Sequence, residues 1–296
     1  MFDLVELFCR IDDFWKNFEP LWKNYLLAEH KTLPKRTSSL SMSEVILILI
    51  LFHFVRYRDF KTFYQNHLSV FLKKEFPGLV SYTQFLELKK RAVFPLYSFL
   101  FSLYGTCSGI SFVDSTSLNV CHPKRIYSHR VFRKMAKRGK TSKGWFYGFK
   151  LHIAVNEKGE LLGFLLTSGQ ASDLAVLPSL VIGLFGKLFG DKGYISQQMT
   201  EILLRQGLQL ITKLRANMKN KFISVIDKIL LRKRGMIDSV IGRLKYGSQI
   251  EHTRHRSPLS FIINLLGGLI TYCLCPNKPS ACLEKSALRM VTMQSI

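Results

Sequence analysis

Acidic residues are scarce in this sequence of 296 residues, which has 20 Asp and Glu against 43 Lys and Arg, for a formal net charge of +23. The shortage is extreme in one stretch, because no acid lies between Asp114 and Glu157 while ten Lys or Arg do. Such a field attracts polyanions and holds them by releasing their counterions. A basic protein without a specific partner is the alternative, but the clustering of the excess favours nucleic acid as the partner.

The sequence also lacks the cysteine patterns of a metal or disulfide scaffold. Its six cysteines include no Cys-x-x-Cys pair, and Cys273 and Cys275 have no His or Cys pair at zinc-finger spacing beside them. We therefore exclude a zinc finger and expect reduced thiols in a cytoplasm.

Targeting and membrane segments are missing as well. Asp3 and Glu6 lie where a signal peptide would begin with basic residues. The apolar run 45–55 is too short to cross a bilayer, and the longer run 259–275 contains Asn264. A membrane protein is the alternative, but a buried core helix explains the second run better, so we expect no membrane and a cytoplasmic location.

What remains is a globular composition, with 47% hydrophobic and 12% aromatic residues. Apolar residues recur at helical spacing through residues 1–104, and Ser41 to Glu44 fits a capping box. Short helices with tight connections are compatible with a helix-turn-helix module that binds DNA. A plain helical bundle fits equally well, because nothing marks a recognition helix.

The pattern changes near Gly105, after which strands and helices alternate. The expected order is strand, hairpin, helix, strand, helix, strand, helix, which predicts a mixed α/β sheet with helices on its faces. This is the order of a ribonuclease-H-like fold. We assign residues 105–275 to a domain with that fold and residues 276–296 to a C-terminal tail. The predicted strands are 110–114, 145–156, 161–166, 188–191 and 208–214, and the predicted helices are 173–185, 196–206, 236–246 and 258–275.

Two aspartates, Asp114 and Asp191, end predicted central strands. A charge in such apolar surroundings is costly unless it is paired or bound to a metal. Ligands of open α/β sheets gather at the carboxyl ends of strands, and hard divalent cations prefer oxygen ligands. Either aspartate alone could instead cap a following turn, so the pair carries the prediction of a metal site.

Asp238 is the candidate for a third acid. Helical spacing puts Arg234, Asp238 and Lys245 on one stripe, where the carboxylate can reach a metal while the cations hold phosphates. A surface helix with ordinary ion pairs is the alternative.

Several motifs together resemble those of insertion-sequence transposases with a DDE catalytic domain. Arg234, Asp238 and Lys245 match the spacing of that family's Tyr-Arg-Glu-Lys signature, and the resemblance covers roughly residues 105–275. The other matching motifs are Phe112-Val113-Asp114-Ser115-Thr116, Phe146-Tyr147-Gly148-Phe149-Lys150-Leu151-His152, Gly190-Asp191-Lys192-Gly193-Tyr194, Leu210-Ile211-Thr212-Lys213-Leu214-Arg215 and Glu251-His252-Thr253-Arg254-His255-Arg256-Ser257.

The resemblance implies a bacterial enzyme that cleaves the ends of its element and transfers them into target DNA, as a dimer or a higher assembly. Its catalytic and metal-binding residues would be Asp114, Asp191 and Asp238. They would hold two Mg²⁺ or Mn²⁺ ions about 4 Å apart, with Asp114 shared by both ions.

The sequence departs from the signature at two positions. Leu231 stands where the signature has tyrosine, and Asp238 stands where it has glutamate. Aspartate is one methylene shorter, so metal geometry could shift by about 1 Å, enough to cost roughly 100-fold in rate. Glu251 is the nearest substitute acid, but it lies outside the stripe and we discount it.

A basic stretch from Lys124 to Lys143 carries nine of the ten cations and several aromatic residues. We expect it to line a path for DNA towards Asp114, although a solvated charged loop is the alternative. The predicted DNA contacts over the whole chain are Arg234, Lys245, Lys150, Lys192, Lys213, Arg215, Lys137, Arg138 and Lys140.

Three other functions stay open at this point. A decayed copy would bind DNA without turnover, a nuclease of the same fold would hydrolyse DNA without joining it, and a membrane protein would need detergent.

Overall fold

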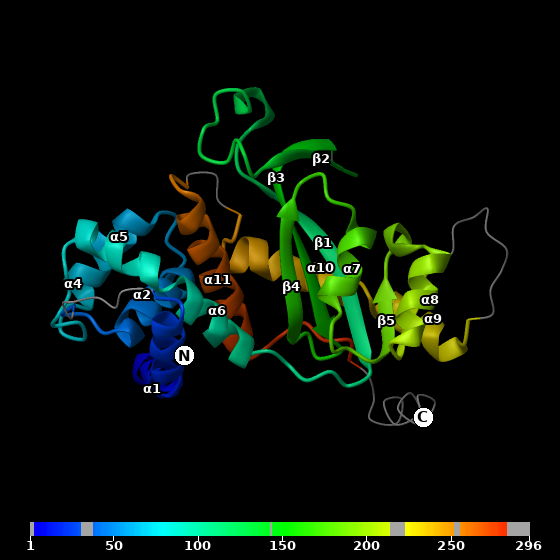
Figure 1. Ribbon diagram of the computed structural model, residues 1–296, viewed down its shortest axis with the longest axis horizontal. Helices are drawn as coiled ribbons and strands as arrows, with labels where there is room; N and C mark the ends of the chain where they lie inside the picture. The colour runs from blue at the N-terminus through cyan, green and yellow to red at the C-terminus, as the bar shows by residue number, and fades with distance from the viewer. Residues whose placement is uncertain (1–2, 31–37, 143, 214–222, 252–254, 283–296) are drawn as a thin grey trace. The chain divides into compact units, whose positions relative to one another are not determined.

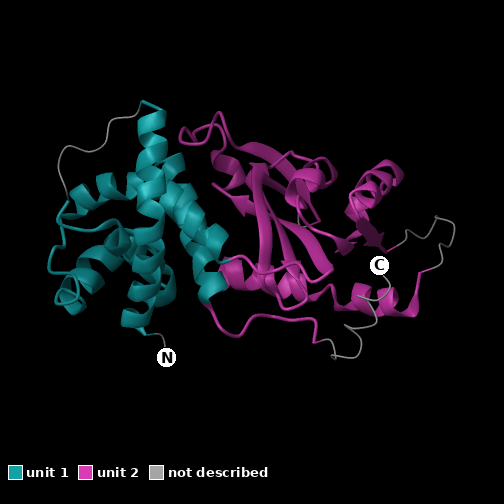
Figure 2. Ribbon diagram, turned by 60° about the horizontal axis from the view of Figure 1, so that its bottom comes forward, with its two compact units in different colours: residues 1–103, 247–250, 256–274 teal, residues 104–246, 251–255, 275–296 magenta. Residues whose placement is uncertain are grey.

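The computed structural model describes residues 3–30, 38–142, 144–213, 223–251 and 255–282. Contacts divide the chain into two compact units, coloured separately in Figure 2. The helical unit comprises residues 1–103, 247–250 and 256–274, and the sheet unit comprises residues 104–246, 251–255 and 275–296. The sequence counted 258–274 with the catalytic domain, whereas contacts group this segment with the N-terminal helices, and the predicted division into three parts stays a prediction.

The helical unit is built around a helix that is apolar on every side. Every residue of α2 from Val45 to His53 is buried, so this helix forms the centre of the unit. The predicted capping box is confirmed, because the Glu44 amide donates to Ser41 Oγ at 3.2 Å and the Ser41 amide donates to Glu44 Oε2 at 2.7 Å. The helices are α1 (Leu4–Ala28), α2 (Met42–Val55), α3 (Phe60–Thr62), a π-helical segment (Phe63–Leu68), α4 (Ser69–Phe71), α5 (Tyr82–Arg91), α6 (Val93–Ser102) and α11 (Pro258–Leu274).

The longest of the late helices, α11, packs on α2 and α6. It is the core helix predicted for this segment, and ten of its residues are buried. None of the helices in the described ranges combines the length and the hydropathy needed to span a bilayer.

A buried histidine joins α2 to the segment that precedes α11. His53 is 4% exposed, and its Nδ1 lies 2.6 Å from the Ser248 carbonyl oxygen, so the neutral ring carries its proton on Nδ1. Burial disfavours the imidazolium and lowers the pKa of His53 to about 4.

This histidine predicts acid sensitivity of the helical unit. Between pH 6.5 and 4, His53 is protonated in the unfolded chain but stays neutral in the folded chain. The contribution of His53 to the free energy of unfolding is therefore fully present above pH 6.5 and is lost as the pH falls towards 4. We expect His53 alone to cost roughly 3 kcal/mol of unfolding free energy over that range. Urea unfolding against pH should show a shallower loss in His53→Gln, whereas exposed His122→Gln should follow the wild type. An identical slope in His53→Gln would contradict the assignment.

The sheet unit contains a mixed sheet of six strands (Figure 1). Its path is β2-β3-β1-β5-β6, with β4 also paired to β3. β1, β5 and β6 run parallel, and β3 runs antiparallel to β1, β2 and β4. The strands are β1 (Ile110–Asn119), β2 (Lys137–Thr141), β3 (Gly144–Asn156), β4 (Leu161–Ser168), β5 (Gly186–Gly190) and β6 (Leu208–Thr212).

Helices pack on this sheet as the ribonuclease-H-like prediction requires, and that fold class is confirmed. α7 contacts β3 and β4, α8 contacts β6, α9 contacts β6, and α10 contacts β1. A buried apolar cluster that includes Val113, Leu177, Leu188 and Leu203 joins the sheet to α7 and α8. These helices are α7 (Asp173–Leu180), α8 (Gln197–Arg205), α9 (Val225–Lys233) and α10 (Met236–Gly242), followed by a π-helical turn (Arg243–Gly247).

Candidate active site

The register of two parallel strands brings the first two predicted acids together. Phe112 of β1 pairs with Phe189 of β5, and two residues further along these strands are Asp114 and Asp191. The predicted pair therefore lies level on neighbouring strands, Asp114 within β1 and Asp191 directly after β5. The Asp191 side chain accepts the amide of Gly193 and begins a 3-10 turn (Lys192–Tyr194), so it has the capping role that the sequence left open as the alternative.

The third predicted acid, Asp238, lies in the first turn of α10, the helix that contacts β1. Its side chain is exposed, whereas the neighbours Met236, Ile237 and Val240 are buried and anchor the helix. α10 therefore places Asp238 beside β1, close enough for its charge to act on Asp114.

The charges of Asp191 and Asp238 both act on Asp114. The Asp114 side chain is only 18% exposed, and burial raises its pKa to about 6 against the opposing influence of Arg234. The charges of Asp238 and Asp191 raise the pKa of Asp114 further. Two like charges beside a buried carboxylate are an arrangement that a bound cation would relieve.

The donors fit a hard divalent cation by type, since all three are carboxylates. Within the described ranges, however, no three His, Cys, Asp or Glu side chains are grouped closely enough to hold a metal ion. The cation that contacts Asp114 in this structure is Arg234, whose Nη2 donates to Asp114 Oδ2 at 2.7 Å.

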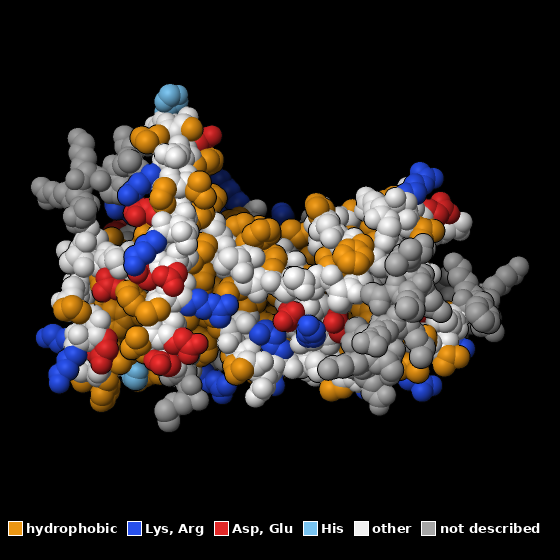
Figure 3. Space-filling view, turned by 90° about the horizontal axis from the view of Figure 1, so that it is seen from below, with side chains coloured by type: hydrophobic (Ala, Val, Ile, Leu, Met, Phe, Trp, Pro, Cys, Tyr) orange, Lys and Arg blue, Asp and Glu red, His pale blue; other side chains and the backbone are white. Residues whose placement is uncertain are grey.

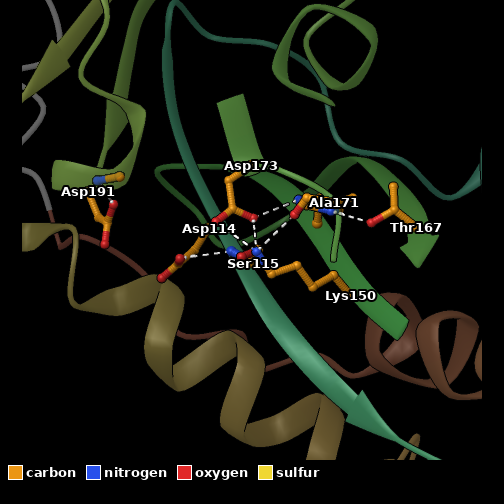
Figure 4. Close-up of polar contacts among 9 residues, drawn as sticks. Asp114, Ser115, Lys150, Thr167, Ala171, Asp173 and Asp191 are labelled. Atoms are coloured by element: carbon orange, nitrogen blue, oxygen red, sulfur yellow. Dashed lines mark hydrogen bonds and ion pairs between the residues drawn. The ribbon is translucent and has the colours of Figure 1, made fainter. Parts of the chain in front are cut away.

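Sequence reasoning missed a second polar cluster beside the first. Lys150 Nζ donates to both carboxylate oxygens of Asp173, at 3.0 and 3.1 Å, and to the Ala171 carbonyl oxygen at 3.2 Å (Figure 4). The buried His152 lies on the same strand, with Nδ1 3.4 Å from the same carboxylate and Nε2 2.9 Å from Thr167 Oγ1. Lys150 is 13% exposed and its amine is engaged here, so its predicted contact with DNA stays a prediction.

Tyr194 connects the two clusters. It is 2% exposed, and its hydroxyl has no hydrogen-bond partner among the residues described. Burial raises its pKa, and the nearby charges of Asp173, Asp114 and Asp191 raise it further. A neutral hydroxyl therefore lies within the field of three acids. Tyr194 belongs to the motif Gly190 to Tyr194, so the sequence pointed to it. Asp173 looked like an ordinary acid at the start of a helix, and no pattern in the sequence indicated its pairing with Lys150.

Comparison with family models adds a match over residues 104–258, more than half of the chain, to the family described as transposase DDE domain. The chain belongs to this family. No curated protein matches the chain. Among solved structures, it is similar to the piggyBac transposase in a cryo-EM structure of a synaptic complex with hairpin DNA, at 12% identity and a TM-score of 0.46, covering 100% of this chain and 80% of that one.

In this DDE domain the residues predicted to contact DNA fall into two groups. Arg234 and Lys245 are largely buried and paired, since Lys245 Nζ lies 3.0 Å from Glu251 Oε2 and 2.5 Å from the Ser117 carbonyl oxygen. Glu251 also accepts both the amide and Nδ2 of Asn119, and these contacts give it a role away from the three acids. The exposed group comprises Lys137, Arg138, Lys140, Lys192 and Lys213, while Arg215 lies outside the described residues.

The basic stretch of the DDE domain is partly a strand, which the sequence did not predict. β2 pairs with β3 and leaves Lys137, Arg138 and Lys140 exposed, while Gly139 between them is buried. Two of these cations stack on aromatic rings. Arg138 Cζ lies 5.5 Å from the ring centroid of Tyr127, and Lys140 Nζ lies 5.8 Å from the ring centroid of Trp145.

A cavity of about 620 Å³ opens beside this strand. Trp145 and Tyr246, both largely exposed, line it together with Arg125 and His129, and none of the three acids does. Cationic and aromatic groups of this kind suit a nucleic acid.

The helical unit offers a different surface. α1 carries Glu6, Asp12, Asp13 and Glu19 against three basic residues. On the face shown in Figure 3, acidic side chains gather over the helical unit, among basic and hydrophobic ones. This charge pattern argues against α1 as a phosphate-binding helix.

Proposed function

We propose that this transposase cleaves the ends of a bacterial insertion sequence and transfers them into target DNA, with a Tyr-Arg-Glu-Lys-type signature that runs from α9 through α10 into the π-helical turn. The observation that carries the proposal is the position of Asp114, which lies level with Asp191 and whose pKa is raised by burial and then by the charges of Asp238 and Asp191. Carboxylates converging from two strands and a helix are suited to hold a pair of hard cations at a scissile phosphate.

In this proposal Asp114, Asp191 and Asp238 would together hold two Mg²⁺ or Mn²⁺ ions. When bound, the ions would activate the attacking hydroxyl group and stabilise the leaving 3′-oxygen. The chain's own residues position the strand. Arg234 and Lys245 would grip phosphates next to the acids, while Lys137, Arg138 and Lys140 on β2 would guide the duplex towards them. The partners are element ends and target DNA, held by a dimer or a higher assembly in the cytoplasm.

A joining assay tests the proposed reaction. The full chain, the DNA ends of its own element cut in advance, a supercoiled target and Mg²⁺ are expected to yield target molecules that carry covalently joined ends. Strand transfer needs no hydrolysis at this stage, so joined product separates a transposase from a nuclease of the same fold. If the protein cleaved uncut ends but joined none, it would be a hydrolytic nuclease and the proposal would be wrong.

Two observations favour a second candidate, a DNA-binding remnant without turnover. Asp238 occupies the glutamate position of the signature, and the acids as described are not grouped as a metal-binding set. Such a remnant would keep DNA binding that weakens with salt and would join no ends at any concentration of Mg²⁺.

A further inference from the structure

Both oxygens of the central acid are already engaged in this structure. Asp114 Oδ1 accepts the Ser115 amide at 2.8 Å, and Asp114 Oδ2 accepts Arg234 Nη2 at 2.7 Å. The two side chains of this ion pair are only 18% and 16% exposed, so water screens them weakly. A divalent cation that approaches Oδ2 meets a fixed positive charge within hydrogen-bond distance of its ligand.

The guanidinium is not fully satisfied where it lies. Arg234 Nε is buried and has no hydrogen-bond partner among the described residues. A guanidinium donates through five N–H groups in a planar fork, and a phosphate accepts two of them side by side. A phosphate oxygen is therefore a better partner for this side chain than one oxygen of Asp114.

The elements on either side of Arg234 are firmly held, so a change of partner requires only the side chain to move. Arg234 follows α9, which is tied to β5 by the buried ion pair of Lys187 with Asp227 at 2.9 Å. After Gly235 comes α10, whose buried residues pack on the sheet unit. A Cβ added at Gly235 would meet no atom within 4 Å, so the backbone beside Arg234 leaves open space.

We propose that Arg234 and a divalent cation compete for Asp114, and that a DNA phosphate ends the competition by drawing the guanidinium away. This inference rests on the proposed function, because it takes the three acids as the cation site and DNA as the partner. Its consequence is reciprocal coupling: DNA binding strengthens cation binding, and cation binding strengthens DNA binding by the same factor. The free protein would then bind its metal ions weakly, and the ions would fill the site only when DNA is bound.

Mn²⁺ binding to the full chain, measured by calorimetry without DNA, tests the competition. Arg234→Gln removes the charge and keeps hydrogen-bonding groups, so it is expected to bind Mn²⁺ roughly 10-fold more tightly than the wild type. Arg234→Lys keeps the charge and should stay within about 3-fold of the wild type. The matched control is Arg232→Gln, an exposed cation two residues away, which should bind Mn²⁺ as the wild type does.

The converse measurement uses a labelled duplex. Saturating Mn²⁺ is expected to tighten DNA binding by the wild type and by Arg232→Gln roughly 10-fold more than it does for Arg234→Gln. Unchanged or weaker Mn²⁺ binding by Arg234→Gln, in a protein that melts like the wild type, would overturn the competition and leave the proposed function intact. Absence of Mn²⁺ binding in every variant, with and without DNA, would overturn the proposed function together with this inference.

Discussion

Replacing Asp114 by asparagine is expected to lower metal-dependent DNA cleavage by roughly 1000-fold or more, to the level seen with a chelator. Asparagine has nearly the same shape but no charge, so it cannot neutralise a dication. Asp191→Asn should behave in the same way, because Asp191 lies level with Asp114 on the neighbouring strand. Cleavage of a labelled element end under single-turnover conditions gives the rates.

The same substitution should leave the fold intact, which separates lost chemistry from lost structure. Burial raises the pKa of Asp114 to about 6, so ionising this side chain at pH 7 already opposes folding, and a neutral amide does not carry that penalty. Thermal melting and DNA affinity should therefore stay near wild-type values. Asp13→Asn, which removes an exposed acid from α1, should change neither binding nor cleavage. Cleavage by Asp114→Asn at the wild-type rate would refute the assignment of the triad.

Lengthening Asp238 to glutamate is expected to raise cleavage by up to about 100-fold, since a shift of about 1 Å in a ligand can cost that much. The Asp238 side chain is exposed on α10, so the fold leaves room for one more methylene. The measurement is again the single-turnover rate, for both the wild type and Asp238→Glu.

The outcome of this substitution also separates the two proposed functions. An inactive wild type with an active Asp238→Glu would identify a decayed copy that one methylene restores. An active wild type that glutamate inactivates would show that Asp238 is not at the glutamate position of the signature. Asp191→Glu serves as the control, because it lengthens an acid that already matches the family motif and should lower the rate.

Local patterns in the sequence were sufficient where a physical rule acts over a few residues. Ser41 and Glu44 predicted the start of α2, and the alternation from Trp145 to Asn156 predicted β3. Asp191 follows the end of β5 as predicted, whereas Asp114, predicted to end its strand at 114, lies within β1, which continues to Asn119 because it pairs with the long strand β3.

The failures occurred where tertiary contacts decide. α1 continues through Pro20 to Ala28, although a proline ordinarily ends or kinks a helix, since an exposed proline costs one hydrogen bond in a helix that Leu7 and Ile11 anchor elsewhere. β2 went unpredicted because a strand of charged residues forms only when an edge of β3 is available to pair with it. Lys150 looked like a surface cation, and only the fold reveals Asp173 beside it.

The order in which the chain leaves the ribosome has a consequence for how it folds. α11, which packs on α2 and α6, is synthesised only after the entire sheet of six strands. Until residue 274 has emerged, the apolar residues of α2 lack one of the helices that cover them. A nascent chain halted within the catalytic domain would therefore expose a sticky hydrophobic helix, which makes incomplete products targets for chaperones and proteases rather than free DNA-binding fragments.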